Sequence, residues 1–214
     1  MSIRTRQDFI RRFNLHPHVP VNRRVDEPLR KRLRPAAVLI PIIERQHGLS
    51  LILTQRSAKL RQHAGQISFP GGRYEHQDQH LLTTALRETE EEIGLARRHI
   101  DLIGRIDDYY TVTGYQVTPV IGLVTPPFDL TPDDHEVAEV FEVPLEFILN
   151  PRNQKLQTVT FEGTRRRYFA TAENGNKFGF CRSVPRGRRG RVVCRALRFA
   201  RHAGRLTASL WAIS

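Results

Sequence analysis

The segment from residue 81 to residue 95 constrains this chain most, because a helical apolar repeat and a dense group of glutamates share the same few turns. The repeat follows the i, i+3, i+4 and i+7 spacing of a helix that buries one face, and it consists of Leu82, Ala85, Leu86, Thr89 and Ile93. Gly94 follows directly and is a typical C-terminal helix cap. We therefore predict a helix over residues 81 to 93 that packs against another element.

Glutamates occupy three neighbouring positions on another face of this helix. Because a helix advances by about 100° per residue, Glu88, Glu91 and Glu92 cluster together. Their mutual repulsion costs about 0.2–0.5 kcal/mol per pair, and the helix dipole disfavours each anion near the C-terminus by roughly 0.3–1 kcal/mol. A bound Mg²⁺ or Mn²⁺ would reverse both effects, since these cations choose carboxylate oxygen and bridge to substrate phosphates. A solvated acidic helix face is the alternative interpretation.

Two nearby features favour the metal site over the solvated face. The pair Gly71 and Gly72, after Pro70, lets the backbone approach a ligand closely. Arg87 lies four residues before Glu91, where its guanidinium can hold that carboxylate in place. The candidate metal ligands are therefore Glu88, Glu91 and Glu92, and Arg87 joins them as a catalytic residue.

These residues resemble the signature of the Nudix hydrolase family. Its second half is matched by Arg87, Glu88, Glu91, Glu92, Gly94 and Leu95, with Thr89 at its first apolar place. In its first half, counted from Gly72, Asp78 stands where the signature has a glutamate, and eight residues rather than seven separate Asp78 from Arg87. This departure leaves the role of Asp78 open.

The segment upstream is similar to the coenzyme A pyrophosphatase branch of that family. The branch has Leu-Leu-Thr-x-Arg-Ser, then Arg, Gly and Phe-Pro-Gly-Gly at intervals of three residues, and only Ile52 differs in this chain. The resemblance implies hydrolysis of coenzyme A, or a derivative, to 3′,5′-ADP and 4′-phosphopantetheine with Mg²⁺ or Mn²⁺. We expect Arg56 and Arg61 to bind substrate phosphate, since planar guanidinium groups suit phosphate oxygens, and Gly71 and Gly72 to lie against the substrate.

The general base has more than one candidate in the sequence. A metal held by the three glutamates would neutralise the diphosphate and lower the pKa of a bound water, and a nearby glutamate would take the water proton. Glu88 is a candidate within the signature, and Glu136 or Glu139 could act from a later loop. Each of these two, taken singly, also fits an ordinary surface acid before a strand.

The rest of the chain predicts an α+β domain with the Nudix fold, in which a mixed β-sheet is packed between helices. Residues 1–34 form an N-terminal arm with a helix at 7–15, residues 35–170 form the Nudix domain, and residues 171–214 form a basic tail. Apolar runs predict strands at 36–43, 49–54, 66–69, 102–106, 116–124 and 139–143. A short helix follows at 145–149, and a hairpin joins 155–161 to 166–170.

The net charge of +12 belongs to one end of the chain. Residues 1–162 hold 21 Lys/Arg and 21 Asp/Glu, whereas residues 163–214 hold 13 Lys/Arg and a single acid. The alternative function of a different class is nucleic-acid binding through this Arg-rich tail. The tail lacks interleaved aromatic residues that would stack on bases, which argues against this alternative. A natural basic extension or a reading-frame change near residue 172 would both produce such a tail.

The composition of the chain limits the kinds of partner and cell compartment that we expect. The two cysteines show no metal-binding spacing, the apolar runs are shorter than the roughly 20 residues that span a bilayer, and no secretion signal follows the basic start. We expect a soluble cytoplasmic enzyme with a small-molecule substrate, no membrane partner and an open choice between monomer and homodimer. Another nucleoside diphosphate derivative, such as ADP-ribose, is the alternative substrate.

Overall fold

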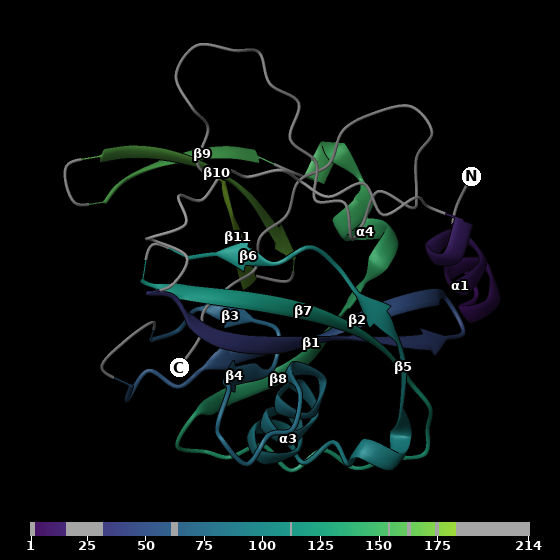
Figure 1. The fold of residues 1–214 in the computed structure, drawn as a ribbon. Helices are drawn as coiled ribbons and strands as arrows, with labels where there is room; N and C mark the ends of the chain where they lie inside the picture. The colour runs from purple at the N-terminus through teal and green to yellow at the C-terminus, as the bar shows by residue number, and fades with distance from the viewer. Residues whose placement is uncertain are drawn as a thin grey trace.

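The computed structural model describes residues 3–15, 32–60, 64–111, 113–153, 155–161, 164–173 and 176–182. Its centre is an eight-stranded mixed sheet in the order β3-β2-β1-β7-β5, in which β4 also pairs with β1, β6 with β7 and β8 with β2 (Figure 1). The strands are β1 Arg34–Arg45, β2 Gly48–Arg56, β3 Ile67–Ser68, β4 Gly71–Arg73, β5 Ile100–Arg105, β6 Tyr109–Tyr110, β7 Tyr115–Val124 and β8 Val137–Pro144. All six predicted strands of the domain are present, with ends shifted by a few residues.

The apolar run of β1 explains its central place. Its residues from Ala36 to Ile43 are all buried, and β1 pairs in parallel with β7 over ten residues while its other edge receives β4 and β2. A strand that is apolar at consecutive positions needs cover on both faces of its sheet. Helices supply that cover on each side.

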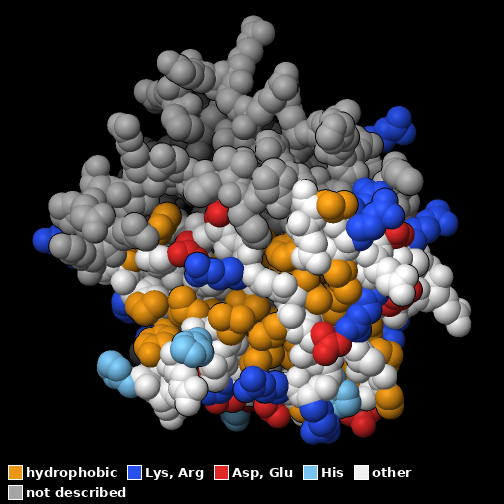
Figure 2. Space-filling model, turned by 45° about the vertical axis from the view of Figure 1, so that its right-hand side comes forward, with side chains coloured by type: hydrophobic (Ala, Val, Ile, Leu, Met, Phe, Trp, Pro, Cys, Tyr) orange, Lys and Arg blue, Asp and Glu red, His pale blue; other side chains and the backbone are white. Residues whose placement is uncertain are grey.

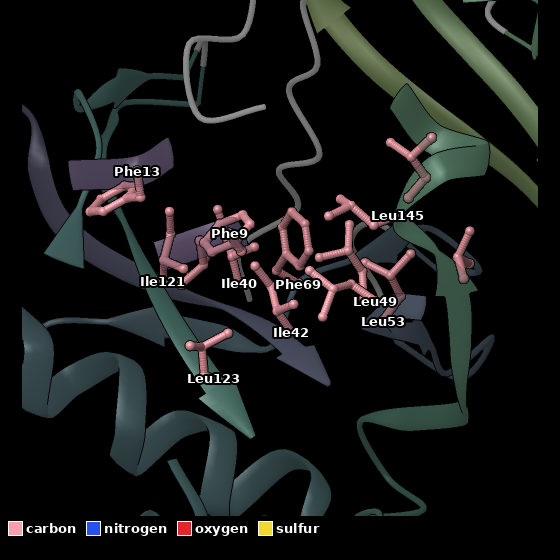
Figure 3. Packing of buried hydrophobic residues seen from close by; sticks show 14 of the residues in the cluster. Phe9, Phe13, Ile40, Ile42, Leu49, Leu53, Phe69, Ile121, Leu123 and Leu145 are labelled. Carbon is pink, nitrogen blue, oxygen red and sulfur yellow. The ribbon is translucent and has the colours of Figure 1, made fainter. Parts of the chain in front are cut away.

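One face of the sheet is covered by α1, Arg6–Leu15, and α4, Leu145–Leu149. Figure 3 shows Phe9 and Phe13 of α1 beside Ile40 and Ile121 of the sheet, in one buried cluster that also includes Leu145. The 7–15 segment is therefore a docking helix, as its aromatic spacing predicted.

The other face is covered by α3, Leu81–Ile93, which the sequence predicted with the same bounds. Gly94 ends it in a left-handed conformation with φ 71°. Leu82 was wrongly placed on the buried stripe, since it is 37% exposed, and Thr84 is buried in its place. Thr89 fits an otherwise apolar position because its hydroxyl donates to the Ala85 carbonyl at 2.6 Å.

A separate three-stranded antiparallel sheet follows the short 3₁₀ helix Pro151–Asn153. It consists of β9 Lys155–Phe161, β10 Thr164–Glu173 and β11 Asn176–Arg182. The hairpin of β9 and β10 matches the prediction, whereas β11 was not predicted and belongs to the segment assigned to the tail. Residues 183–214, with most of that segment's arginines, lie outside the described residues.

The described surface mixes charges of both signs. On the face in Figure 2, Lys and Arg side chains lie next to Asp and Glu side chains, with apolar side chains between them. This agrees with the equal numbers of basic and acidic residues up to position 162. Among the described helices, none combines the length and apolar composition that a membrane crossing requires.

Candidate active site

The last turn of α3 meets the backbone of β4 at a buried carboxylate. Glu92 is only 5% exposed, and the Gly71 amide donates to its Oε2 at 3.1 Å. Burial raises the pKa of the Glu92 carboxyl to about 8, and the nearby charges of Glu88 and Glu136 add to that rise. The Gly71 hydrogen bond and the Arg56 charge oppose it.

Glu88 lies one turn earlier on α3, against the backbone of Gly72. A Cβ atom added to Gly72 would lie 2.4 Å from the Glu88 carboxylate carbon. An added Cβ would push the Glu88 carboxylate out of this position, so the second glycine is what allows the close approach. Burial also raises the pKa of Glu88, with Arg87 opposing and Glu91 and Glu136 adding to the rise.

Arg87 forms hydrogen bonds to three acidic residues of this site. Its guanidinium donates to Asp78 through Nε at 2.9 Å and Nη2 at 3.0 Å, to Glu88 at 2.9 Å and to Glu91 at 2.8 Å. Nη2 also donates to the Arg73 carbonyl at 3.1 Å. The predicted pairing of Arg87 with Glu91 is therefore present, and Glu91 remains 58% exposed at the outer end of the group.

Asp78 is the buried partner that orients Arg87. Its carboxylate accepts two guanidinium hydrogen bonds from Arg87, one from the Thr84 hydroxyl and one from the Glu75 amide. The hydrogen bonds from Arg87, above all, lower the pKa of Asp78 to about 2, and burial opposes them. Asp78 therefore holds the Arg87 guanidinium in position, although its spacing from Arg87 differs from the signature by one residue.

Arg56 lies beneath this site rather than at its surface. It is 5% exposed, its Nη1 is 3.9 Å from Glu92 Oε1, and its buried Nε has no hydrogen-bond partner. The geometry therefore directs Arg56 toward a candidate metal ligand. Arg61, the other predicted phosphate ligand, lies outside the described residues.

A loop before β8 closes the C-terminal end of α3. The Thr131 amide donates to the Ile93 carbonyl at 2.9 Å, and the Asp133 amide donates to the Glu92 carbonyl at 3.0 Å. The Glu136 carbonyl accepts from the Ser57 amide at 2.8 Å, which ties this loop to β2. Glu136 is consequently near Glu88 and Glu92, whereas Glu139 lies on β8 opposite Gln55 and is exposed.

Comparison with known proteins assigns the fold and its chemistry. Residues 33–170 match the family described as NUDIX domain. The chain belongs to the Nudix family. It is 44% identical over 142 residues to a protein named "Uncharacterized Nudix hydrolase NudL" from Citrobacter koseri, covering 66% of this chain and 70% of that protein.

A protein of the same name from Photorhabdus laumondii is 39% identical over 162 residues, which cover 76% of this chain and 83% of that protein. Among solved structures, a Caenorhabditis elegans Ap4A hydrolase matches with a TM-score of 0.46 and 19% identity, covering 52% of this chain and 80% of that one. The protein is a Nudix hydrolase with the α+β Nudix fold. We call α3 the Nudix helix, because it carries the residues that match the second half of the family signature.

Enzymes of the Nudix family generally use divalent metal ions, and the donor chemistry of this site suits them. Carboxylate oxygen is the ligand that hard divalent cations prefer. Burial raises the pKa values of Glu88 and Glu92, and neighbouring carboxylates add to the rise, so a bound cation would favour their charged forms. Across the described ranges, no three acidic, His or Cys side chains are already gathered around one point. Arg87 and the Gly71 amide hold the glutamate oxygens in their present places.

Proposed function

We propose that this Nudix hydrolase cleaves the diphosphate of coenzyme A, or of a coenzyme A derivative, to 3′,5′-ADP and 4′-phosphopantetheine, with Mg²⁺ or Mn²⁺ as its cofactor. The observation that carries the proposal is the match of residues 52–72 to the coenzyme A pyrophosphatase branch. Three parts of that segment support the Nudix helix or its loop: Arg56 faces Glu92, Ser57 binds Glu136, and Gly71 binds Glu92.

Glu88, Glu91 and Glu92 are the residues proposed to hold the metal. When bound, the metal would neutralise the diphosphate and lower the pKa of a water molecule. The Gly71 amide holds Oε2 of Glu92, the Arg56 guanidinium lies 3.9 Å from its Oε1, and Arg87 holds Glu88 and Glu91. Since no three acidic, His or Cys side chains meet at one point among the described residues, these carboxylates would turn toward the ion when it binds.

The hydrolysis needs a base for the attacking water. Water oxygen bonds to one phosphorus, the bridging P–O bond breaks, and the water proton passes to a carboxylate. Glu136 is our first choice because its charge acts on both Glu88 and Glu92 and its loop is anchored to β2 and α3. Glu88 is the second choice. Glu139 shares a face of β8 with Phe141 and Val143, which pack on the side of the sheet away from α3.

A panel of diphosphates tests the proposal directly. Coenzyme A, acetyl-coenzyme A, 3′-dephospho-coenzyme A, ADP-ribose and a diadenosine tetraphosphate are each incubated with Mg²⁺ or Mn²⁺, and the products are identified by mass. We expect the highest kcat/KM for a coenzyme A, with 3′,5′-ADP and a phosphopantetheine as products. Chelation with EDTA should stop the reaction. A higher kcat/KM for ADP-ribose or the diadenosine compound would refute the assignment of substrate.

The matched control is Glu90→Gln on the same helix. Glu90 is exposed and lies between the proposed ligands in sequence but on another side of α3. Its variant loses one charge from the helix, as the ligand variants do. Activity retained by Glu90→Gln and lost by Glu91→Gln would show that position, rather than net charge, matters.

A further inference from the structure

Two arginines lie close to the ring of Tyr115, where the starts of β1 and β7 pair. The Cζ atom of Arg34 lies 4.1 Å from the centroid of the Tyr115 ring, and the Cζ atom of Arg73 lies 5.6 Å from it. Both arginines are exposed, whereas Tyr115 is only 4% exposed. The buried ring therefore forms a base on which two solvent-facing guanidinium groups are placed.

Strand register explains why three distant positions meet. Arg34 of β1 pairs with Tyr115 of β7, and Ala36 of β1 pairs with Arg73 of β4. Residues two apart on a strand share a face of the sheet, so Arg34 and Ala36 align with neighbours on both edges of β1. The side chains of Arg34, Arg73 and Tyr115 consequently lie on the face of the sheet that points away from α3. Tyr115 confirms this, because it belongs to the buried cluster that includes α1 and α4.

The electrostatics of this group favour an anion. Each guanidinium is attracted to the ring face, but two like charges on one ring repel each other. Arg34 donates to the Thr113 carbonyl at 3.4 Å and forms no ion pair with any described residue. A phosphate monoester placed at these exposed guanidinium groups would offset the charge of Arg34, and the planar guanidinium fork of both arginines suits its oxygens.

The position of Arg73 connects this group to the Nudix helix. Arg73 directly follows Gly72, whose backbone lies against the Glu88 carboxylate, and its own carbonyl accepts a hydrogen bond from Arg87. Successive side chains of a strand point to opposite faces. A substrate that passes the short strand β4 can therefore place its diphosphate at the glutamates and a second phosphate beside Arg73.

We propose that Arg34 and Arg73, supported by Tyr115, form a subsite for a phosphate monoester of the substrate, separate from the diphosphate that is cleaved. The inference rests on the proposed function, under which this group is the 3′-phosphate of coenzyme A. The subsite selects substrates that carry both a diphosphate and a monoester phosphate.

Binding without metal tests the subsite independently of turnover. Calorimetry on the full chain compares 3′,5′-ADP with 5′-AMP, which has the same 5′-phosphate but lacks the 3′-phosphate. We expect the wild type to bind 3′,5′-ADP at least about tenfold more tightly, because hydrogen bonds between charged groups are among the stronger ones. Arg34→Ala and Arg73→Ala should each reduce this preference severalfold, and the double variant should remove it.

Arg98→Ala is the control, since Arg98 is an exposed arginine on the 3₁₀ helix Arg97–His99 and its loss changes net charge equally. It should keep the full preference for 3′,5′-ADP. A loss of preference equal to that of Arg73→Ala would overturn the subsite, because it would reflect general charge. An absence of any preference in the wild type would overturn it as well.

Kinetics give the second readout. The ratio of kcat/KM for coenzyme A to that for 3′-dephospho-coenzyme A should fall at least about tenfold in Arg73→Ala, with Arg73→Lys retaining more of the ratio. Tyr115→Leu should lower the ratio further than Tyr115→Phe, which keeps the ring, provided that circular dichroism shows both are folded. Equal losses on both substrates would overturn the subsite.

The two proposals fail in different ways. If the wild type with Mg²⁺ or Mn²⁺ does not hydrolyse coenzyme A, the proposed function is wrong, and the binding of 3′,5′-ADP alone decides whether the subsite exists. If coenzyme A is hydrolysed but its 3′-phosphate adds nothing to kcat/KM, the function stands and the subsite is wrong.

Discussion

The two faces of the main sheet bury different chemistry. On the side of α1 and α4, the buried side chains are apolar, as Phe9, Ile42 and Leu51 illustrate. On the side of α3, an apolar cluster is accompanied by buried Glu92, Arg56 and Asp78. The same sheet contributes to both sides, so the contrast comes from the side chains of the helices that cover each face.

We interpret this contrast as a division between a face that stabilises the fold and a face that carries the candidate active site. Each fully buried large apolar side chain contributes about 1.5–3 kcal/mol, whereas a buried charge costs several kcal/mol unless its partners offset the lost hydration. Asp78 and Arg87 offset that cost with two hydrogen bonds, but Arg56 and Glu92 are 3.9 Å apart and offset it poorly. A protein selected only for stability would fill that place with apolar side chains.

The largest expected effect is a loss of stability from a substitution in the apolar face alone. Leu51 is fully buried on β2, so Leu51→Ala should lower the free energy of unfolding by about 2–5 kcal/mol through lost burial and a residual cavity. Activity per folded molecule should stay near that of the wild type. Urea denaturation and turnover at low temperature measure the two quantities, and a loss of turnover in fully folded protein would show that the faces are coupled.

The second expected effect removes charge from the α3 face. Glu88→Gln, Glu91→Gln and Glu92→Gln should each reduce turnover at least about a hundredfold by weakening metal binding. Their stability should change little, or rise, because mutual repulsion and the cost of a buried carboxylate both diminish. Steady-state kinetics at limiting Mg²⁺ and thermal unfolding test this. Near-normal activity in any variant would remove that residue from the set of ligands.

The third effect is a pH dependence of stability from Asp78. Its pKa in the folded protein is lowered to about 2 from its ordinary value of 3.8, so it contributes stability that is present above about pH 4. That contribution, roughly 2 kcal/mol, should be lost as the pH falls from about 4 to about 2. Asp78→Asn should be less stable at neutral pH and show a smaller loss in this window. Parallel pH profiles of unfolding for the two proteins would contradict the role of Asp78.

The smallest effect distinguishes two roles for Arg56. If its buried guanidinium supports Glu92, Arg56→Gln should lower kcat for coenzyme A and for 3′-dephospho-coenzyme A by a similar factor, about tenfold for a lost charged contact. Arg56→Lys, which keeps the charge, should lose less. A selective rise in KM for coenzyme A would instead support the phosphate contact that the sequence motif suggests.

Local sequence patterns were sufficient for the elements that carry them. The period of α3, its cap at Gly94 and the apolar run of β1 each follow from spacing that a few consecutive residues display. Short strands without such a pattern were not predicted, and β4 shows why. Gly71 and Gly72 have no side chains to alternate, so β4 is held in the sheet by its backbone pairing with β1.

Spacing along the chain was enough to predict that Glu88, Glu91 and Glu92 share a helix face and that Arg87 can reach Glu91, because helix geometry relates positions three and four apart. It did not determine that Glu92 is buried, that Asp78 holds Arg87, or that Arg56 faces Glu92. Those contacts join residues on different elements, and the packing of α3 against β1 and β4 of the sheet brings them together. Burial and pairing are set by neighbours in space, so only the tertiary structure could assign these three roles.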